Sequence, residues 1–391
     1  MYPNLYYAFK DLFGIEIQGL RWVNSFGFFV ALAFIAAAWI LTLELKRKEK
    51  QALLTYKEIK IWIGKPASIL SLGWNGLLGF ILGYKFIGAF MGSDIAVANL
   101  SPQDYLLSNK GSWWGGIVLG TLLITLRWLE KKKRQLSKPE QRVIRMWPHD
   151  KVGDLLVVAL IFGFLGAKIF HNLENLDELI HAEKPLELFL SFSGLTFYGG
   201  LIFAGIAIYW FCKKNNISFI PFLDAIAPAM MLAYAIGRIG CQVAGDGDWG
   251  IENLHPNPLS WLPNWMWSYN YPHNVIDAGI SIPGCVGPYC HQLPIPVYPT
   301  PLYETISCLI LFGILWFLRK QITKPGIIAG IYFLMNGIER FFVEKIRVNT
   351  QYHFWGINPT QAEIIAIFLM IVGLSMLVYF NKRKTTVPKK L

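Results

Sequence analysis

Long apolar runs separated by short basic clusters dominate the sequence. Nine of these runs approach the length of about 20 mostly apolar residues that an α-helix needs to cross a bilayer. The pattern predicts a single all-α domain over residues 1–391, a polytopic integral membrane protein with about nine transmembrane helices. The predicted spans are residues 22–43, 66–90, 111–129, 152–172, 197–213, 218–237, 302–319, 326–346 and 360–381.

Basic residues are distributed unevenly between the loops. If the N-terminus is outside, the inner segments hold 26 of the 36 lysines and arginines, whereas the long segment 238–301 holds only Arg238. Because cytoplasmic loops carry an excess of lysine and arginine, we expect the N-terminus outside and the C-terminus inside. Segment 238–301 is then a long extracytoplasmic loop. The first twenty residues resemble no cleavable signal peptide, so the first span is expected to serve as the targeting signal.

Composition narrows the class further. Hydrophobic residues make up 54% of the chain and charged residues 16%, whereas a typical soluble domain has about 25% charged residues. Soluble, disordered and collagen-like classes are therefore excluded. The net charge of +11 does not indicate nucleic-acid binding, because the basic residues lie in clusters between apolar runs and form no continuous stripe.

The outer loop 251–301 is rich in proline and aromatic residues. It suits an interfacial aromatic belt or, alternatively, a lid or polypeptide-docking surface. Cys285 and Cys290 lie in this loop, on the side where a disulfide is expected. Cys212 and Cys308 lie in spans and are expected to be small core residues.

A short repeat places two lysines near outer ends of spans. GFILGYKF at 79–86 resembles GFLGAKIF at 163–170, and the lysines are Lys85 and Lys168. A lysine in such a place usually extends to the membrane interface, and we expect the same here.

The first of three polar clusters at outer span ends is GRIGCQVAGDGDWG at 237–250. Arg238 lies where the helix is expected to break, and its forked guanidinium suits a phosphate group. Asp246 and Asp248 are placed to orient it, and the glycines allow tight turns. The alternative is an arginine that extends to the interface, followed by a flexible loop.

The second cluster is GIERFFVEKIRVN at 337–349. Arg340, Glu344 and Arg347 have the spacing of residues that share one helix face. A structural ion ladder is one interpretation. Two arginines against one carboxylate, however, leave an unpaired positive charge that an anionic ligand would complete, and Arg347 is expected to lie nearest to water.

The third cluster combines the runs SGLTFYGGLIFAG at 193–205 and YPTPLYET at 298–305. The candidate residues are Tyr198, Gly199 and Gly200 in the first run and Tyr303 and Glu304 in the second. Close packing of helices through small residues is the alternative explanation for the glycines.

Metal and cofactor chemistry is not indicated. The seven histidines show no metal-ligand spacing, and the sequence contains neither a P-loop nor a G-x-S-x-G motif. We expect no metal ion and no cofactor.

The clusters together resemble the prolipoprotein diacylglyceryl transferase family. That family's signature reads approximately GRIGNFINGELWG, and its HGGLIG, HPSQLYE and RxxxExxR runs are similar to YGGLIF at 198–203, YPTPLYE at 298–304 and RFFVEKIR at 340–347. The resemblance covers residues 1–45 and 150–381. Segment 46–149, with two extra spans, is interpreted as an insertion that takes no part in the chemistry.

The resemblance implies a transferase of the bacterial cytoplasmic (inner) membrane. It would move the diacylglyceryl group of phosphatidylglycerol to the lipobox cysteine thiol of a prolipoprotein at the outer leaflet, and glycerol phosphate would leave. By analogy Arg238 binds the lipid headgroup and Arg340 is a second essential arginine. The expected catalytic residues are Arg340, Glu344, Tyr198 and Glu304, and the expected substrate-binding residues are Arg238, Gly199, Gly200, Asp246, Tyr303 and Arg347.

Three departures from the family pattern leave the general base open. Tyr198, Tyr298 and Cys241 stand where the family has two histidines and an asparagine. Glu344, Glu304 and Asp246 are therefore alternative proton acceptors, and a covalent role for Cys241 is disfavoured because no neighbour would activate its thiol.

A transporter of an anionic lipid or metabolite is the alternative function, since intramembrane arginines at broken helices also suit transport. Clustering of the charges on one side, and the lack of related halves, favours the transferase. A receptor or scaffold would leave the cluster at 340–347 unexplained.

Overall fold

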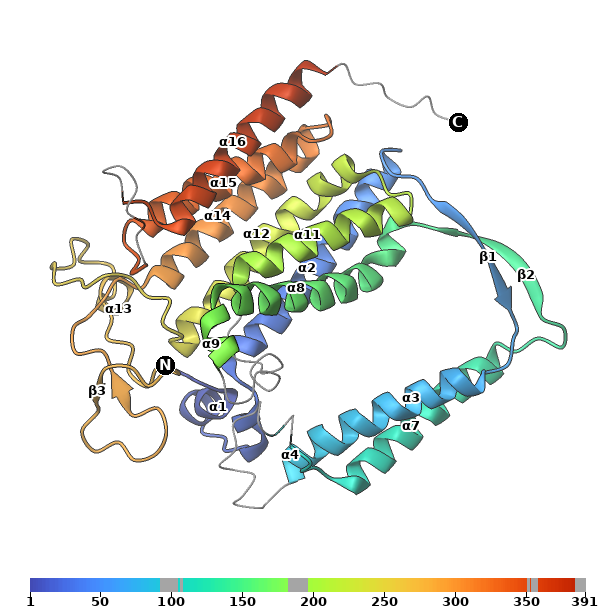
Figure 1. Cartoon of the computed structure of the whole chain (residues 1–391), viewed down its shortest axis with the longest axis horizontal. Coiled ribbons are helices and arrows are strands. Elements are labelled where there is room, and N and C mark those ends of the chain that lie inside the picture. The colour runs from blue at the N-terminus through green and yellow to red at the C-terminus, as the bar shows by residue number, and fades with distance from the viewer. Residues whose placement is uncertain (92–104, 106–107, 182–195, 350–351, 353–357, 384–391) are drawn as a thin grey trace.

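The computed structural model describes residues 1–91, 105, 108–181, 196–349, 352 and 358–383. Parts of run 193–205, segment 46–149 and the basic tail at 381–390 fall outside these ranges. The described protein is mostly helical, and most helices lie side by side in one elongated bundle (Figure 1). The all-α prediction is confirmed, since the four strands form only two small two-stranded sheets.

Within the described ranges, six helices are long and apolar enough to cross a membrane, so a multi-pass membrane protein is indicated. They are α2 (Ser25–Lys50), α3 with its π-helical end (Ile69–Ile87), α8 with its preceding turn (Pro148–Glu174), α12 (Phe219–Ala244), α14 (Thr300–Gln321) and α16 (Gln361–Lys382). The other three expected spans are also helical, as α7 (Trp113–Lys133), α11 (Phe197–Lys214) and α15 (Ile327–Glu344). These three helices carry charged residues and are not among the helices that are apolar enough to cross a membrane. The number of nine spans and the orientation of the termini therefore stay predictions.

Helix α12 lies at the centre of the bundle, where it packs against α2 and α14, while α15 packs on α16 and α11 on α8. Its buried side chains, such as Phe222 and Met231, join two apolar clusters with the neighbouring helices. Cys212 and Cys308 are fully buried in these clusters, which confirms their prediction as core residues.

A network of buried charges joins α2, α12, α14 and α15 at the end of the bundle where α12 begins and α14 finishes. The Asp224 carboxylate accepts hydrogen bonds from the backbone amides of Gly326 (2.8 Å) and Ala329 (2.9 Å) and lies 3.3 Å from the Lys48 ammonium. Glu44 pairs with Arg47 (2.8 Å) and with Arg319. Each charge of this network therefore has a partner, as burial of a charge requires.

Segment 46–149 forms a hairpin of α3 (Ile69–Leu82) and α7, which pack on each other beside the main bundle (Figure 1). An antiparallel ribbon joins this hairpin to the bundle, formed by β1 (Lys57–Ile63) and β2 (Glu140–Met146). Because the ribbon brings the two ends of the segment together, its geometry supports the proposal of an insertion.

The prediction that the repeat lysines extend to the membrane interface is wrong for Lys168, which is buried, and stays a prediction for Lys85, which is half-buried. The Lys85 ammonium donates to the backbone carbonyls of Tyr105 (2.9 Å), Ser108 and Lys110 (2.9 Å) and thereby holds the loop before α7. Lys168 is only 5% exposed. Loop carbonyl groups thus surround the Lys85 ammonium, whereas Lys168 lies within the helical structure.

The segment between α12 and α14 gathers at one end of the bundle with the N-terminus and helices α1 (Leu5–Phe13), α4 (Gly88–Met91) and α9 (Leu176–His181) (Figure 1). It holds α13 (Asn264–Trp267) and a minimal hairpin of β3 (Ile280–Ser281) and β4 (His291–Gln292). The predicted Cys285–Cys290 disulfide is confirmed. Trp261 is 75% exposed, as an interfacial belt or a docking surface would require.

Candidate functional site

Three arginines surround one buried carboxylate at the end of the bundle where α12 and α15 finish and α14 begins. Glu304, in the first turns of α14, is fully buried. Its Oε2 lies 2.6 Å from Arg238 Nε, and its Oε1 lies 2.8 Å from Arg340 Nη1 and 3.3 Å from Arg347 Nη1. Residues far apart in sequence thus form one cluster, which we call the arginine cluster.

Two further carboxylates complete the charge balance of the arginine cluster. Asp248 pairs with Arg238 and lies 2.7 Å from Arg347. Glu344 lies 3.0 Å from Arg340 and also accepts a 2.6 Å hydrogen bond from the Asn349 side chain. Each arginine is at most 17% exposed at its side chain and Glu304 and Glu344 are fully buried, so their ion pairs are shielded from water, whereas Asp248 is 36% exposed.

This arrangement corrects the prediction of an unpaired positive charge. Three arginines face three carboxylates, because Glu304 and Asp248 arrive from other segments of the chain. The helix ends at Glu344, so Arg347 leaves the shared helix face and pairs with Asp248 and Glu304. Its side chain is 8% exposed, less than Arg340 at 17%, so the prediction that Arg347 lies nearest to water is wrong.

The loop after α12 is shaped to carry Asp248 to the arginines. Gly245 ends the helix in the left-handed conformation (φ 65°), which glycine adopts without strain. A Cβ on Gly250 would collide with the carbonyl oxygen of Ile346, so only glycine fits where the loop passes the end of α15. The Thr300 hydroxyl donates to the backbone carbonyl of Asp248 (2.7 Å) and thereby holds the loop against the start of α14.

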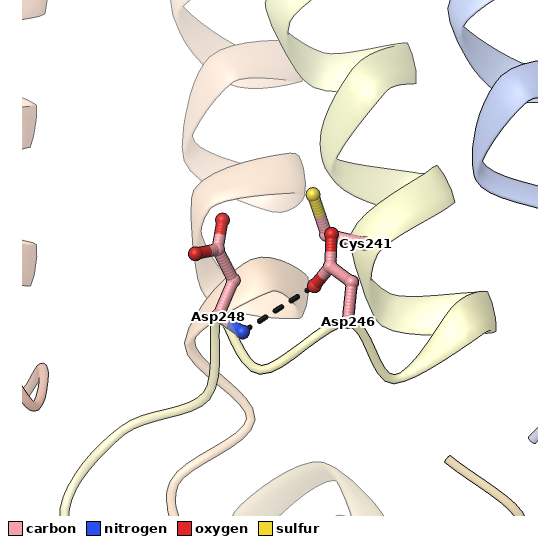
Figure 2. Close-up of side chains that lie close together, drawn as sticks. All are labelled: Cys241, Asp246 and Asp248. Carbon is pink, nitrogen blue, oxygen red and sulfur yellow. Dashed lines mark hydrogen bonds between the residues drawn. The ribbon is translucent and has the colours of Figure 1, made fainter. Parts of the chain in front are cut away.

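Asp246, Asp248 and Cys241 lie close together on the last turn of α12 and the loop after it, with the Asp246 side chain directed toward Cys241 (Figure 2). The backbone amide of Asp248 donates to Asp246 (3.3 Å). These three groups have the spacing of metal ligands, but Arg238 Nη1 already occupies their neighbourhood, paired with Asp248 and 3.7 Å from Cys241 Sγ. A guanidinium in that place disfavours a cation, so the arrangement gives no support to a metal site.

The two aspartates differ in their electrostatic surroundings. Burial and the neighbouring Asp248 raise the pKa of Asp246 above its ordinary value. Burial also acts to raise the pKa of Asp248, but the guanidinium groups of Arg238 and Arg347 outweigh it and lower that pKa. Asp246 is thus the more basic of the pair, and it makes no ion pair with an arginine of the cluster among the described residues.

The tyrosines divide between the cluster and its surroundings. Tyr198, in the first turn of α11, lies beside Arg340 and interacts with it. Tyr303 instead donates to the backbone carbonyl of Trp267 (3.3 Å) and anchors the outer segment. The Tyr298 ring also packs on Trp267. Of these three, only Tyr198 is brought to the arginine cluster, whereas Glu304 next to Tyr303 forms its centre.

Gly199 and Gly200 lie where α11 crosses α8. A Cβ on Gly199 would approach the Gly166 carbonyl oxygen to 2.5 Å, and one on Gly200 would approach the Gly163 carbonyl oxygen to 2.9 Å. Close packing of the two helices accounts for both glycines, and their contact with substrate stays a prediction.

Two residues of the site were missed by sequence reasoning. The Tyr234 hydroxyl donates to Glu304 (3.4 Å), and the Arg238 guanidinium lies over the Tyr234 ring at 5.3 Å. Tyr234 lies one helical turn before Arg238, and this spacing could have indicated that the two side chains are neighbours. Glu339 is 7% exposed, and neither carboxylate oxygen has a hydrogen-bond partner among the described residues; its place beside Arg340 in the chain gave no indication that it faces inward.

Comparison with known proteins gives a consistent result. The family model described as prolipoprotein diacylglyceryl transferase matches residues 110–379, so the match begins inside segment 46–149. A phosphatidylglycerol–prolipoprotein diacylglyceryl transferase from Lactobacillus acidophilus is 27% identical over 74% of this chain and 92% of its own length. The corresponding figures are 28%, 71% and 93% for the Leptospira interrogans protein and 27%, 72% and 93% for the Pseudomonas aeruginosa protein, both with the same name.

Proposed function

The chain belongs to the prolipoprotein diacylglyceryl transferase family and is a membrane-bound transferase, and we propose how its arginine cluster performs the transfer. The substrates are phosphatidylglycerol and a prolipoprotein, as in the relatives' names. The diacylglyceryl group passes to the lipobox cysteine thiol. The observation that carries the proposal is the cluster of three half-buried arginines around the buried Glu304 at one end of the helical bundle.

The reaction needs positive charge on the departing phosphate. The thiolate sulfur attacks a glycerol carbon, the new C–S bond forms, and the electron pair of the C–O bond leaves with the phosphate as glycerol phosphate. Preorganised donors aimed at developing charge are among the strongest catalytic effects. Arg238 and Arg340, which now share the Glu304 carboxylate, are the donors that we assign to the phosphate oxygens.

Before substrate binds, the three arginines of the cluster are balanced by three carboxylates. A phosphodiester brings one negative charge to a place that already holds three carboxylates. It therefore competes with Glu304 for the guanidinium groups. In this proposal the carboxylates keep the arginines in place without substrate and are exchanged in part for phosphate oxygens when the lipid enters.

The general base is assigned to Asp246. Glu304, Glu344 and Asp248 are each paired with at least one arginine, so their carboxylate oxygens are already engaged in ion pairs. Asp246 has no such partner among the described residues, and its pKa is raised. Tyr198 then serves as a hydrogen-bond donor beside Arg340, and Glu339 is a second carboxylate that makes no ion pair with an arginine in the described part of the chain.

We predict a specific pH dependence from this assignment. Because Asp246 acts ionised and its pKa is raised, the transfer rate falls as pH decreases through a value above the ordinary aspartate pKa. Asp246→Asn lowers kcat by about 10²–10⁴, the usual contribution of a general base, and abolishes that acidic limb. Rates measured across pH with saturating lipid test this.

The stability of the same variant separates the base from a merely structural residue. A raised carboxyl pKa means that the folded state loses stability as pH rises through that pKa. Asp246→Asn is therefore expected to unfold at a higher temperature than the wild type at neutral pH, while its activity is lost. An unchanged acidic limb in Asp246→Asn would move the assignment to Glu339 or Glu304.

The placement of the reaction in the cell is part of the proposal. The asymmetric basic residues support nine spans with the N-terminus outside. The arginine cluster then faces the outer leaflet of the bacterial inner membrane, on the side where secreted precursors arrive. Segment 46–149 is proposed to be an insertion outside the chemistry, and the ribbon that joins it to the bundle supports this.

Incubation of the purified protein with phosphatidylglycerol and a lipobox peptide tests the proposed function directly. Mass spectrometry should show the peptide heavier by one diacylglyceryl group, with glycerol phosphate released in equal amount. A peptide in which serine replaces the lipobox cysteine is the matched control and should remain unmodified. Absence of the modified cysteine peptide with active wild-type protein in lipid would overturn the proposal.

A further inference from the structure

The β1–β2 ribbon lies at the end of the bundle opposite the arginine cluster. It continues from the end of α2, where Lys48 pairs with Asp224 in the first turns of α12, whereas Arg238 lies in the last turns of α12. The ribbon also joins the start of α3 and the end of α7 to the start of α8 (Figure 1). Helices of membrane-spanning length thus hold it near one membrane surface.

The two faces of the ribbon have different chemistry. Strand residues alternate between faces, and the register places Ile59 opposite Ile144 and Lys57 opposite Met146. One face carries five apolar residues that are half-buried, Ile59, Ile61, Ile63, Ile144 and Met146, and the same face holds Lys57 at one end and Arg142 and Glu140 toward the other. The other face is exposed and includes Lys60, Trp62 and Arg145.

The apolar face needs a partner. Neither strand packs extensively on a helix in the described part of the chain. An isolated two-stranded ribbon is at best marginally stable in water, and further strands or packing on another surface are needed for its stability. A surface that accepts the isoleucines would provide the missing burial.

The charge of the region indicates which surface this is. Segments 57–65 and 127–146 hold 11 lysines and arginines against three glutamates. Basic side chains lie over aromatic rings, with Lys65 4.5 Å from the Trp62 ring and Arg145 4.7 Å from the Tyr56 ring. Apolar side chains flanked by lysine, arginine and tryptophan are typical of segments that lie in the interface of an anionic membrane.

We propose that the β1–β2 ribbon is an anionic-lipid-binding element that lies on the membrane surface, with its isoleucine face toward the acyl chains and its basic residues among phosphate headgroups. The ribbon would thereby fix the α3–α7 hairpin relative to the bundle from the side opposite the arginine cluster. This interaction is independent of the transfer reaction.

The test uses the full chain with a single fluorophore on the ribbon. Ile61→Cys places the label on the apolar face, and Trp62→Cys places it on the opposite face as the matched control. Cys212, Cys241 and Cys308 are buried and Cys285 is disulfide-bonded, so the introduced thiol takes the label. Each protein is reconstituted in vesicles of phosphatidylcholine, with or without phosphatidylglycerol, that contain a lipid quencher on the acyl chain.

The label at position 61 is expected to be quenched several-fold more than the label at position 62, and more strongly when phosphatidylglycerol is present. Replacing Lys60, Arg142 and Arg145 with glutamate should remove the effect of phosphatidylglycerol while leaving diacylglyceryl transfer unchanged. Equal quenching at both positions in phosphatidylglycerol vesicles would overturn the proposal. So would a label at position 61 that is quenched only after the protein is diluted among more vesicles, which would indicate that a second copy of the chain covers the face.

Discussion

Replacing Arg238 with lysine is expected to lower kcat/KM for diacylglyceryl transfer by about 10²–10³, the usual cost of one preorganised donor to developing charge. Lysine keeps the positive charge but not the fork that contacts Glu304 through Nε and Asp248 through Nη1. A single ammonium cannot bridge these groups and also hold two phosphate oxygens. The measurement is steady-state transfer to a lipobox peptide with phosphatidylglycerol in detergent micelles.

Arg319→Lys is the matched control for this prediction. Arg319 is also buried and also pairs with a carboxylate, Glu44, but it belongs to the charge network at the opposite end of the bundle. Its replacement is expected to reduce stability and to leave kcat/KM within a few-fold of wild type. An Arg238→Lys enzyme with wild-type kcat/KM would show that the phosphate is held elsewhere.

The sequence was sufficient to predict the helical class and to single out several members of the arginine cluster, because these depend on local pattern. Apolar runs of span length predicted helices that the structure contains, and Arg238, Arg340 and Glu344 were identified from their motifs. Their partners depend on tertiary contacts instead. Glu304 comes from another helix, and α15 ends at Glu344, so Arg347 lies off the expected helix face.

Burial was the property that the sequence predicted least well. Lys168 was expected at an interface and is buried, and Glu339 looked like one more charge beside Arg340. Whether a polar side chain on an apolar helix faces lipid, water or another helix depends on which neighbour packs there. A single sequence indicates which way such a side chain faces only where its helical spacing links it to a known site residue, as the i, i+4 spacing links Tyr234 to Arg238.

The Glu304→Gln variant is expected to be the least stable of the site variants. Glutamine keeps the size of the side chain but removes the negative charge that lies within 3.3 Å of all three arginines. Breaking a buried ion pair by removing one partner costs about 3–5 kcal/mol. Because Asp248 and Glu344 remain, the cluster is then left with one unbalanced positive charge. The transfer rate also falls, because Arg238 and Arg340 lose the carboxylate that holds them in place.

The same imbalance predicts a partial rescue by lipid. The phosphate of phosphatidylglycerol supplies the missing negative charge, and a ligand that binds only the folded state raises its stability. The melting temperature of Glu304→Gln should therefore be lowest in neutral detergent and should rise more on addition of phosphatidylglycerol than that of wild type. Glu44→Gln, which removes an equally buried partner of two arginines at the other end of the bundle, should be destabilised without this extra rise. If both variants respond equally to the lipid, or neither does, the arginine cluster is not where the phosphate binds, because only Glu304 neutralises the guanidinium groups that the phosphate is proposed to contact.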